Sequence, residues 1–378
     1  MKGEEYSNLL KIFIFQASQA TRLPKMKGIQ TDDSGADVII PDEANFVFIK
    51  SSFECKSSQS ENGSFFLKVF CENMAKIGND DSLFDVMNAV LRVLKANRSE
   101  DSLTPRNNIL PEITSTLLEP MFFHSERKTS LISSNYEVKP SAGKLMYFSY
   151  SRSGAEKNIV AIKKSFQSIG FKVEVYRDLI ADDVRDILRY GNVLCRTSDC
   201  QRTAQCLLYH KRDASADYSD DSCVAVAIMG TGKSNSLHTN PNHFLKDEMN
   251  IAEIISKLIM KKKENEERED LSGKPKLFFL DICREFDGYP LNPVTTPLEF
   301  DDTLIFHGCY QGKLTYREDC GSWFIQQLCK AIDEIRGESI SLIEVLQKVQ
   351  KTLVDKHEKR QMPVFYSTLS NNLIIKKV

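Results

Sequence analysis

The sequence predicts an α/β protein with a mainly parallel β-sheet flanked by helices on both faces, preceded by a partial copy of the same fold. Two observations lead to this prediction. Strand-like and helix-like segments alternate along the second part of the 378-residue chain, and segments near its start recur in the same order near its end. Alternation of this kind is typical of strands joined by crossover helices, which cover both faces of a parallel sheet.

The elements of the second part follow from the spacing of its apolar residues. Ile159, Ile162 and Phe166 recur every three or four positions, as on the buried face of a helix. The segment Lys276–Ile282 is a short apolar run, typical of a buried parallel strand. The predicted strands are Lys144–Tyr150, Phe171–Tyr176, Cys223–Met229, Lys276–Ile282 and Leu373–Ile375. The predicted helices are Ala155–Ser168, Asp182–Tyr190, Lys246–Met260, Ser322–Arg336 and Ser341–Lys356.

An internal repeat relates the two ends of the chain. The sequence KIFIFQAS of Lys11–Ser18 resembles KLFFLDIC of Lys276–Cys283, and GSFFL of Gly63–Leu67 resembles GSWFI of Gly321–Ile325. Two further pairs follow in the same order, namely Ser82–Met87 with Ser341–Leu346 and Ser115–Leu117 with Ser367–Leu369. The first copy contains only the later elements of the fold, so we expect that it cannot complete the same core alone.

Composition excludes several other classes of protein. The formal net charge of -2 gives no electrostatic case for binding nucleic acid or an anionic membrane, and no apolar run approaches the length of a membrane span. The ten cysteines form no C-x-x-C pair, so we expect no zinc site and no thioredoxin-type redox site, and no other metal or cofactor is predicted. Because no secretory signal is predicted either, we expect a cytoplasmic protein with reduced thiols. The apolar run Leu9–Phe15 follows the acidic pair Glu4 and Glu5, so no signal peptide is predicted.

Three motifs in the second part resemble those of a known family. The sequence KPKLFFLDICR of Lys274–Arg284 is similar to K-P-K, a run of apolar residues and Q-A-C-R-G. Ser151–Gly154 is similar to R-x-G-T, and Thr315–Arg317 with Gly321–Gln326 is similar to S-W-R followed by G-S-W-F-I-Q. Because these matches keep their order over most of residues 144–378, the chain resembles the caspase family of cysteine endopeptidases (caspase/gingipain-like clan). Within that family it is most similar to a divergent, nematode-like homologue.

The resemblance implies a division of the chain into four parts. Residues 136–300 correspond to a caspase large subunit and residues 301–378 to a small subunit. Residues 1–123 correspond to a partial unit, the end of a large subunit plus a small-subunit-like region. The polar segment 124–135 is expected to be a linker between the two copies.

The resemblance also implies that the catalytic pair is broken. It places Cys283 at the position of the nucleophile, and Met229 or Gly230 at the position of the histidine that accepts its proton. Neither residue can act as a base, and removing a general base costs roughly 10²–10⁴ in rate. His238 and His243 follow in a polar loop. The chain is therefore predicted to be a pseudo-enzyme in which Cys283 is a vestigial nucleophile.

The pocket for the substrate aspartate is changed as well. Arg152 and Arg317 match the two arginines that hold the aspartate, and Tyr316 matches the tryptophan of S-W-R. Between the two arginines the family places the glutamine of Q-A-C-R-G. Asp281 stands in place of the glutamine of Q-A-C-R-G. A carboxylate there would repel an acidic substrate by a few kcal/mol at ~4 Å and an effective dielectric constant of about 20. Glu285 replaces the glycine whose backbone contributes to the oxyanion site.

The first copy departs from the family in a similar way. Its Gln16-Ala17-Ser18 aligns with Q-A-C, which places Ser18 at the position of the nucleophile. A serine needs a base even more than a cysteine does. Lys50 aligns near the position of a pocket arginine.

Two alternative functions have some support in the sequence. The segment Ala227–Ser234 (AIMGTGKS) nearly matches a phosphate-binding P-loop, which would make the chain a nucleotide-binding protein if a helix followed directly. The second alternative is an active cysteine-type endopeptidase of the caspase family with Cys283 as nucleophile and a relocated base.

The function that we favour is a non-catalytic regulator of an active caspase. Small subunits in this family pair through edge strands, and dimerisation promotes activation of the zymogen. We expect the chain to bind a caspase or procaspase through its small-subunit edge strand, to inhibit activation and so to act in negative regulation of apoptosis. The same edge strand could instead be covered by the other copy in the same chain, as an intramolecular pseudo-dimer, or by a second chain in a homodimer.

Overall fold

The computed structural model describes most of the two predicted copies. The described residues are 10–17, 44–52, 59–60, 63–97, 111–123, 131, 134–139, 142–191, 216–233, 236–239, 247–261, 267–284, 300–310, 313–337, 339–357 and 360–378. The chain divides into two compact units. Unit 1 comprises Met1–Tyr136, Gly288–Ile305 and Ser339–Ile375, and unit 2 comprises Glu137–Asp287, Phe306–Glu338 and Lys376–Val378.

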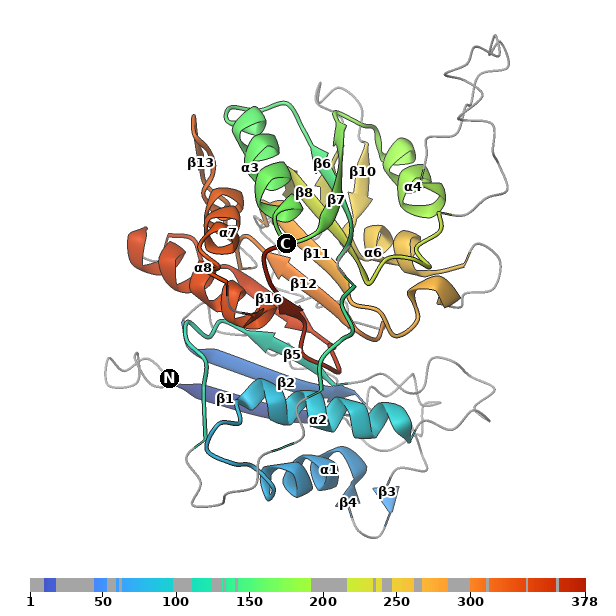
Figure 1. The fold of residues 1–378 in the computed structure, drawn as a ribbon, viewed down its shortest axis with the longest axis vertical. Coiled ribbons are helices and arrows are strands. Elements are labelled where there is room, and N and C mark those ends of the chain that lie inside the picture. Colours follow the sequence, from blue (N-terminus) through green and yellow to red (C-terminus); the bar gives the residue numbers. More distant parts are fainter. Residues whose placement is uncertain are drawn as a thin grey trace, which may run out of the picture. The chain divides into compact units, whose positions relative to one another are not determined.

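Unit 2 is built on four parallel strands in the order β11-β8-β6-β7 (Figure 1). Its strands are β6 (Gly143–Ser149), β7 (Phe171–Arg177), β8 (Cys223–Lys233), β9 (Ser236–His238), β10 (Glu248–Asn250), β11 (Lys276–Ile282), β13 (Arg317–Glu318) and β14 (Gly321–Ser322). Its helices are α3 (Ala155–Gln167), α4 (Ala181–Tyr190), α6 (Ile251–Ile259), η2 (Glu269–Leu271) and α7 (Trp323–Asp333). Every residue of β11 is buried, as its apolar sequence predicts.

The helices of unit 2 pack in two pairs. Phe166 of α3 packs edge-on against Phe279 of β11, and α3 also hydrogen-bonds to α7 through Asn158 and Gln326. On α4, Arg185 pairs with Glu253 of α6 at 2.7 Å. The predicted α/β class, with a mixed and mostly parallel sheet flanked by helices on both faces, is confirmed.

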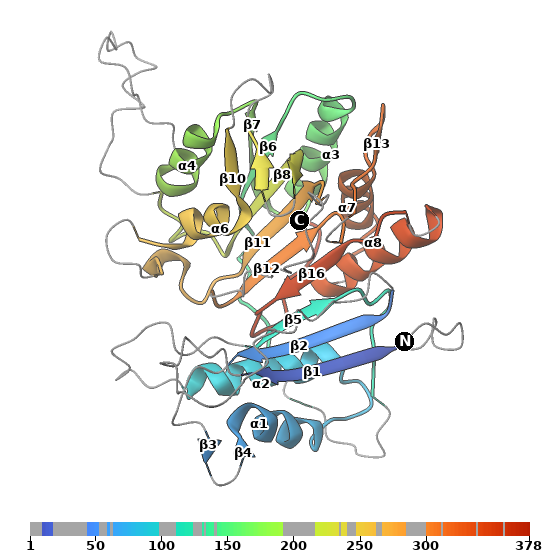
Figure 2. The same ribbon diagram turned by 180° about the vertical axis from the view of Figure 1, so that it is seen from behind.

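Unit 1 is built on mixed strands in the order β1-β2-β5-β16, followed by β12 (Figure 2). Its strands are β1 (Lys11–Ala17), β2 (Phe46–Ser52), β3 (Gln59–Ser60), β4 (Gly63–Ser64), β5 (Glu112–Ser115), β15 (Ile340–Ser341), β16 (Val364–Ser367) and β17 (Ile374–Ile375), with the first residues of β12 (Thr303–His307). Its helices are α1 (Phe65–Met74), α2 (Leu83–Ala96) and α8 (Leu342–Lys356).

The centre of unit 1 joins residues that are far apart in sequence. Strands β5 and β16 pair in antiparallel orientation, with Ser115 opposite Phe365, Thr114 opposite Tyr366 and Ile113 opposite Ser367. Strand β5 also pairs with β2, and β16 lies next to β12. Strands β5 and β16 therefore each have a neighbour on both sides, and neither is an open edge.

Most predicted elements match the structure, with four corrections. The helix predicted at Lys246–Met260 begins only at Ile251, because Glu248–Asn250 forms β10 and the Asn250 side chain caps the helix. Strand β8 continues to Lys233 instead of ending at Met229. The predicted strand Leu373–Ile375 shortens to β17, which pairs only with the two-residue β15. Strands β12 and β16 are absent from the predicted strands, which include only one strand next to them in the sheet, β11.

The described residues contain neither a membrane-spanning helix nor a metal-binding group. None of the described helices is long and apolar enough to cross a membrane. The described histidines, cysteines and carboxylates form no group that could hold a metal ion.

Candidate functional site

The candidate site lies in unit 2, where Cys283 follows the last residue of β11 directly. Its thiol is half-buried and free. Its Sγ atom lies 3.5 Å from Oγ1 of Thr315 and 3.9 Å from the carbonyl oxygen of the same residue. Within the described residues, these are the sulfur's polar contacts, and neither atom is a base suited to accept the thiol proton.

The residues aligned with the histidine lie on the adjacent strand. Met229 of β8 pairs with Asp281 of β11, and Gly230 pairs with Ile282, one residue before Cys283. Met229 is buried, and the Asn158 amide contacts its sulfur at 2.8 Å. A Cβ atom at Gly230 would lie only 2.4 Å from a methyl group of Leu237, so this position is packed for glycine.

Neither polar contact of the Cys283 sulfur involves His238, the one of the two downstream histidines that the structure describes. His238 lies on β9 opposite Thr231, and its Nε2 atom is 3.6 Å from Glu248 Oε1. His243 lies outside the described residues. A third histidine, His307, was not singled out from the sequence. Burial and the nearby Arg284 hold its pKa well below the ordinary value, so its imidazole is neutral.

Arg152 and Arg317, which the resemblance assigns to the substrate pocket, lie close enough for the charge of one to act on the other. Burial lowers the pKa of Arg152, and the Arg317 charge lowers it further, whereas Cys283 and Asp281 act in the opposite direction. Nη1 of Arg317 is buried and has no hydrogen-bond partner within the described part of the chain. Two guanidinium groups held together in this way favour an anion between them.

Asp281 lies buried beside these arginines, with 1% of its surface exposed. Burial raises its pKa to about 6, against the effects of a hydrogen bond from Ser322 and the charge of Arg317. A Cβ atom added at Gly308 would lie 3.2 Å from Asp281 Oδ1, so the carboxylate is enclosed by protein. At neutral pH the site therefore already contains an internal anion, which offsets the charge that would attract an acidic peptide.

A residue that the sequence analysis missed fixes the geometry of the site. Asn158 is fully buried on α3, and its Oδ1 atom accepts hydrogen bonds from the Ser322 backbone at 3.1 Å and from Gln326 at 2.8 Å. The loop that carries Arg152 touches the hairpin that carries Arg317, because Gly154 and Gly321 allow their backbones to meet. An asparagine in a helix gives no sequence signal for such a role.

The other predicted site residues divide into three groups. Tyr316 stacks on Trp323 with ring centroids 5.0 Å apart, next to Arg317. Lys50 lies on β2, opposite Glu112 of β5. Ser18 and Glu285 lie outside the described residues, so the vestigial nucleophile of the first copy and the oxyanion position stay predictions.

The structure does not support the P-loop alternative. Residues 227–233 belong to β8, and after a two-residue interval the chain returns antiparallel as β9. A hairpin provides no helix N-terminus for a phosphate group, whereas a P-loop requires one. The nucleotide-binding interpretation of Ala227–Ser234 is therefore wrong.

The repeated segments share their local hydrogen bonds. The Thr116 hydroxyl accepts from the Phe46 backbone N–H, as the Thr368 hydroxyl does from Thr303. The backbone N–H groups of Leu117 and Leu369 each donate to the serine two residues earlier. Helices α1 and α7 both begin after a capping serine.

Comparison with known proteins matches the chain to one family. The model of the Caspase domain family matches residues 4–122 and 135–374. Caspase-7 of Gallus gallus is 24% identical over 307 residues, which cover 74% of this chain and 86% of that protein. Caspase-1 of Spodoptera frugiperda is 25% identical over 254 residues, covering 60% of this chain and 73% of that protein. Caspase drICE of Drosophila melanogaster is 24% identical over 252 residues, covering 59% of this chain and 64% of that protein.

Proposed function

The chain belongs to the caspase family of cysteine peptidases, and from this premise we propose that it is a non-catalytic member that binds a caspase zymogen and inhibits its activation. It would thereby act in negative regulation of apoptosis, in the cytoplasm. The surroundings of Cys283 are the observation on which this proposal depends. Its described polar partner is Thr315, and we interpret Met229 and Gly230, on the adjacent strand, as standing where the family has its base.

The state of the pocket supports a loss of peptide cleavage. Arg152 and Arg317 remain together, but the buried carboxylate of Asp281 lies beside them. A substrate aspartate would bring a second negative charge into a low-dielectric site, which is unfavourable by a few kcal/mol at ~4 Å and a dielectric constant of about 20. Cleavage would therefore be slower, and an acidic substrate would bind more weakly.

The arrangement of unit 1 supports a role in pairing. We interpret residues 1–123 as a partial caspase copy and the β5–β16 ladder as an intramolecular pseudo-dimer contact between the two small-subunit-like regions. A procaspase would then bind by exchange, with its own last strand taking the place of β5 or β16. Such a complex would hold the zymogen in a dimer that contributes no second working site.

A peptidase assay on the purified full-length chain tests the loss of activity. Cleavage of aspartyl peptides is expected to be no faster than for Cys283→Ala, because that substitution removes a thiol without a base. Cleavage that disappears in Cys283→Ala would restore the active-endopeptidase alternative.

A second assay tests the regulatory role with an active caspase. The full-length chain and its Cys283→Ala variant are each incubated with a self-processing procaspase, and association and processing are measured together. Both forms are expected to bind and to slow processing equally. The proposal fails if neither form binds, or if processing is unchanged while binding occurs.

A further inference from the structure

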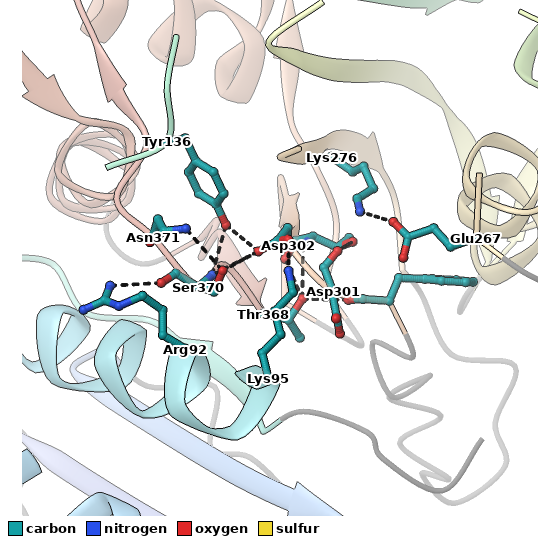
Figure 3. Close-up of polar contacts among 12 residues, drawn as sticks. Arg92, Lys95, Tyr136, Glu267, Lys276, Asp301, Asp302, Thr368, Ser370 and Asn371 are labelled. Atoms are coloured by element: carbon teal, nitrogen blue, oxygen red, sulfur yellow. Dashed lines mark hydrogen bonds and ion pairs between the residues drawn. The ribbon is translucent and has the colours of Figure 1, made fainter. Parts of the chain in front are cut away.

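A buried carboxylate in unit 1 is bonded by both predicted copies. Asp302 is fully buried, and its Oδ2 atom lies 2.6 Å from the ammonium of Lys95 on α2. Its Oδ1 atom accepts hydrogen bonds from the hydroxyls of Tyr136 and Ser370, both at 2.6 Å. Figure 3 shows these side chains converging on Asp302 from the helix of the first copy and from the second copy. We call these four residues the Asp302 cluster.

The equivalent position in the first copy shows that the backbone does not require this charge. Asn45 and Asp302 both have positive φ, at 64° and 51°. Each donates its backbone N–H to the carbonyl of a threonine, Thr116 and Thr368, and each accepts from a backbone N–H two residues after that threonine. Since asparagine also tolerates the left-handed conformation, the aspartate needs another explanation.

The contacts around the β5–β16 ladder are nearly reciprocal. From α2 of the first copy, Asn88 bonds to Asn372 and Arg92 to the Ser370 carbonyl. From α8 of the second copy, Gln347 bonds to the Glu119 carbonyl, and Lys351 pairs with the Glu119 carboxylate. A surface that contacts its own equivalent in this way is the arrangement of a two-fold interface.

The Asp302 cluster has no reciprocal counterpart among the described contacts of this interface. Val354 occupies on α8 the place that Lys95 has on α2, at the same distance from the N-cap serine. Leu118 occupies the place of Ser370, since both donate their backbone N–H to the residue at 45 or 302. Two second copies paired together would therefore bury each Asp302 against Val354, without the cation.

We propose that the Lys95–Asp302 pair determines which partner the second copy accepts. It favours the first copy, which brings a lysine, over another second copy or the small subunit of a caspase that lacks a cation there. The reason is that a carboxylate buried without a cation is costly, whereas the pair with its two hydroxyl donors is satisfied. An incoming chain can displace the first copy only if it carries a basic residue at the place of Lys95. This inference rests on the pseudo-dimer of the proposed function and names the partner chemistry that it selects.

The test uses the full chain with a specific protease site introduced between residues 124 and 130 and cut once. The cut gives two pieces, one with the first copy and one with the second. Native mass spectrometry counts pairs of unlike pieces (one of each) and pairs of like pieces (two of the same). Dilution measures how tightly the unlike pieces bind. The variants are Lys95→Met, Asp302→Asn and the two combined. Lys351→Met is the matched control, because Lys351 forms an ion pair in the same interface with 47% of its side chain exposed.

We expect the effect of Lys95→Met to depend on whether residue 302 is an aspartate. Lys95→Met weakens the pairing of unlike pieces on the order of 10- to 100-fold. Asp302→Asn, which reproduces Asn45, has a small effect on that pairing and allows pairs of like pieces to form. In the Asp302→Asn background, Lys95→Met has no further effect, and Lys351→Met changes little in any background.

Two results would overturn the inference. One is an equal loss from Lys95→Met with and without Asp302→Asn, which would make the lysine a packing residue. The other is an Asp302→Asn chain whose like pieces stay apart. Because no procaspase is present, these outcomes are distinct from a failure of zymogen binding. Separation of the unlike pieces in the parent chain would instead refute the pseudo-dimer itself.

Discussion

Asp281 in unit 2 and Asp302 in unit 1 are both fully buried carboxylates, yet the protein shifts their pKa values in opposite directions. Burial raises the pKa of Asp281 to about 6, because the arginines and hydroxyls near it compensate only in part. Burial also raises the pKa of Asp302, but Lys95, Ser370 and Tyr136 outweigh that effect and hold the pKa below its ordinary value.

The two sites differ in whether the protein stabilises the ionised form of the aspartate. At Asp302 a cation and two hydroxyls lie within hydrogen-bonding distance, so the ionised form contributes to the stability of the fold. At Asp281 the Oδ1 atom has no hydrogen-bond partner within the described residues, so the ionised form is a cost. The buried charge of unit 1 is satisfied, whereas the charges around Asp281 in unit 2 are only partly matched.

The largest effect is expected where the Asp281 site depends on close backbone contact. Gly154 has φ of 76°, and a Cβ atom there would lie 2.5 Å from the Cα atom of Gly321. Gly154→Ala should therefore separate the Arg152 loop from the Arg317 hairpin and cost about 3 kcal/mol or more in the free energy of unfolding. Denaturant titration of the full chain measures this loss.

A matched glycine separates the steric clash from backbone strain. Gly273 has φ of 70°, and no atom lies within 4 Å of its hypothetical Cβ. Gly273→Ala should cost only about 1 kcal/mol, which is the strain of the left-handed backbone. Equal losses in the two variants would contradict the close contact at the site.

A smaller effect, with a definite pH dependence, is expected from Asp281→Asn. The folded-state pKa of about 6 lies above the ordinary value of 3.8, so the stability contributed by this group is present below pH 4 and lost as the pH rises through 6. At about 1.4 kcal/mol per pKa unit, the parent should lose on the order of 2 kcal/mol relative to the variant between pH 4 and pH 7. Unfolding titrations at several pH values measure this difference.

Asp302→Asn provides the opposite pH dependence as a control. The pKa of Asp302 is lowered, so its contribution is present above its unfolded-state pKa and is lost as the pH falls through the folded-state value. The parent should therefore lose stability relative to Asp302→Asn only under acidic conditions. If both variants changed with pH in the same direction, the contrast between the two aspartates would be refuted.

The sequence predicted the framework of the fold better than its contacts. The strand Lys276–Ile282 is correct at both ends, because an apolar run directly after Pro275 has few alternatives to a buried strand. Strand β16 was missed because four residues after Pro363 carry little periodicity, and its pairing with β5 joins segments that sequence patterns do not connect. Local patterns report which face of an element is buried, but not what covers it.

The candidate site shows the same limit. Motif resemblance brought Cys283, Arg152, Asp281 and Arg317 to one place, and the structure brings the two arginines and Asp281 together. The roles of Asn158 and of the contact between Gly154 and Gly321 depend on distances between elements. The cluster at Asp302 was missed for the same reason, since Lys95 and Asp302 have no sequence relation that would link them.

The smallest effect is expected from an ion pair that has the chemistry of Lys95–Asp302 without its burial. Lys164 on α3 lies 3.0 Å from Asp333 on α7, but 74% of the lysine side chain and 31% of the aspartate side chain are exposed. A double-mutant cycle with Lys164→Met and Asp333→Asn should give a coupling free energy of about 0–0.5 kcal/mol, because water solvates both charges when they separate. The same cycle at Lys95 and Asp302 should give a clearly larger value, since Asp302 has only 1% of its side chain exposed. Similar coupling at the two pairs would mean that burial does not set the strength of the contact. The reason for assigning partner choice to Lys95 would then be lost.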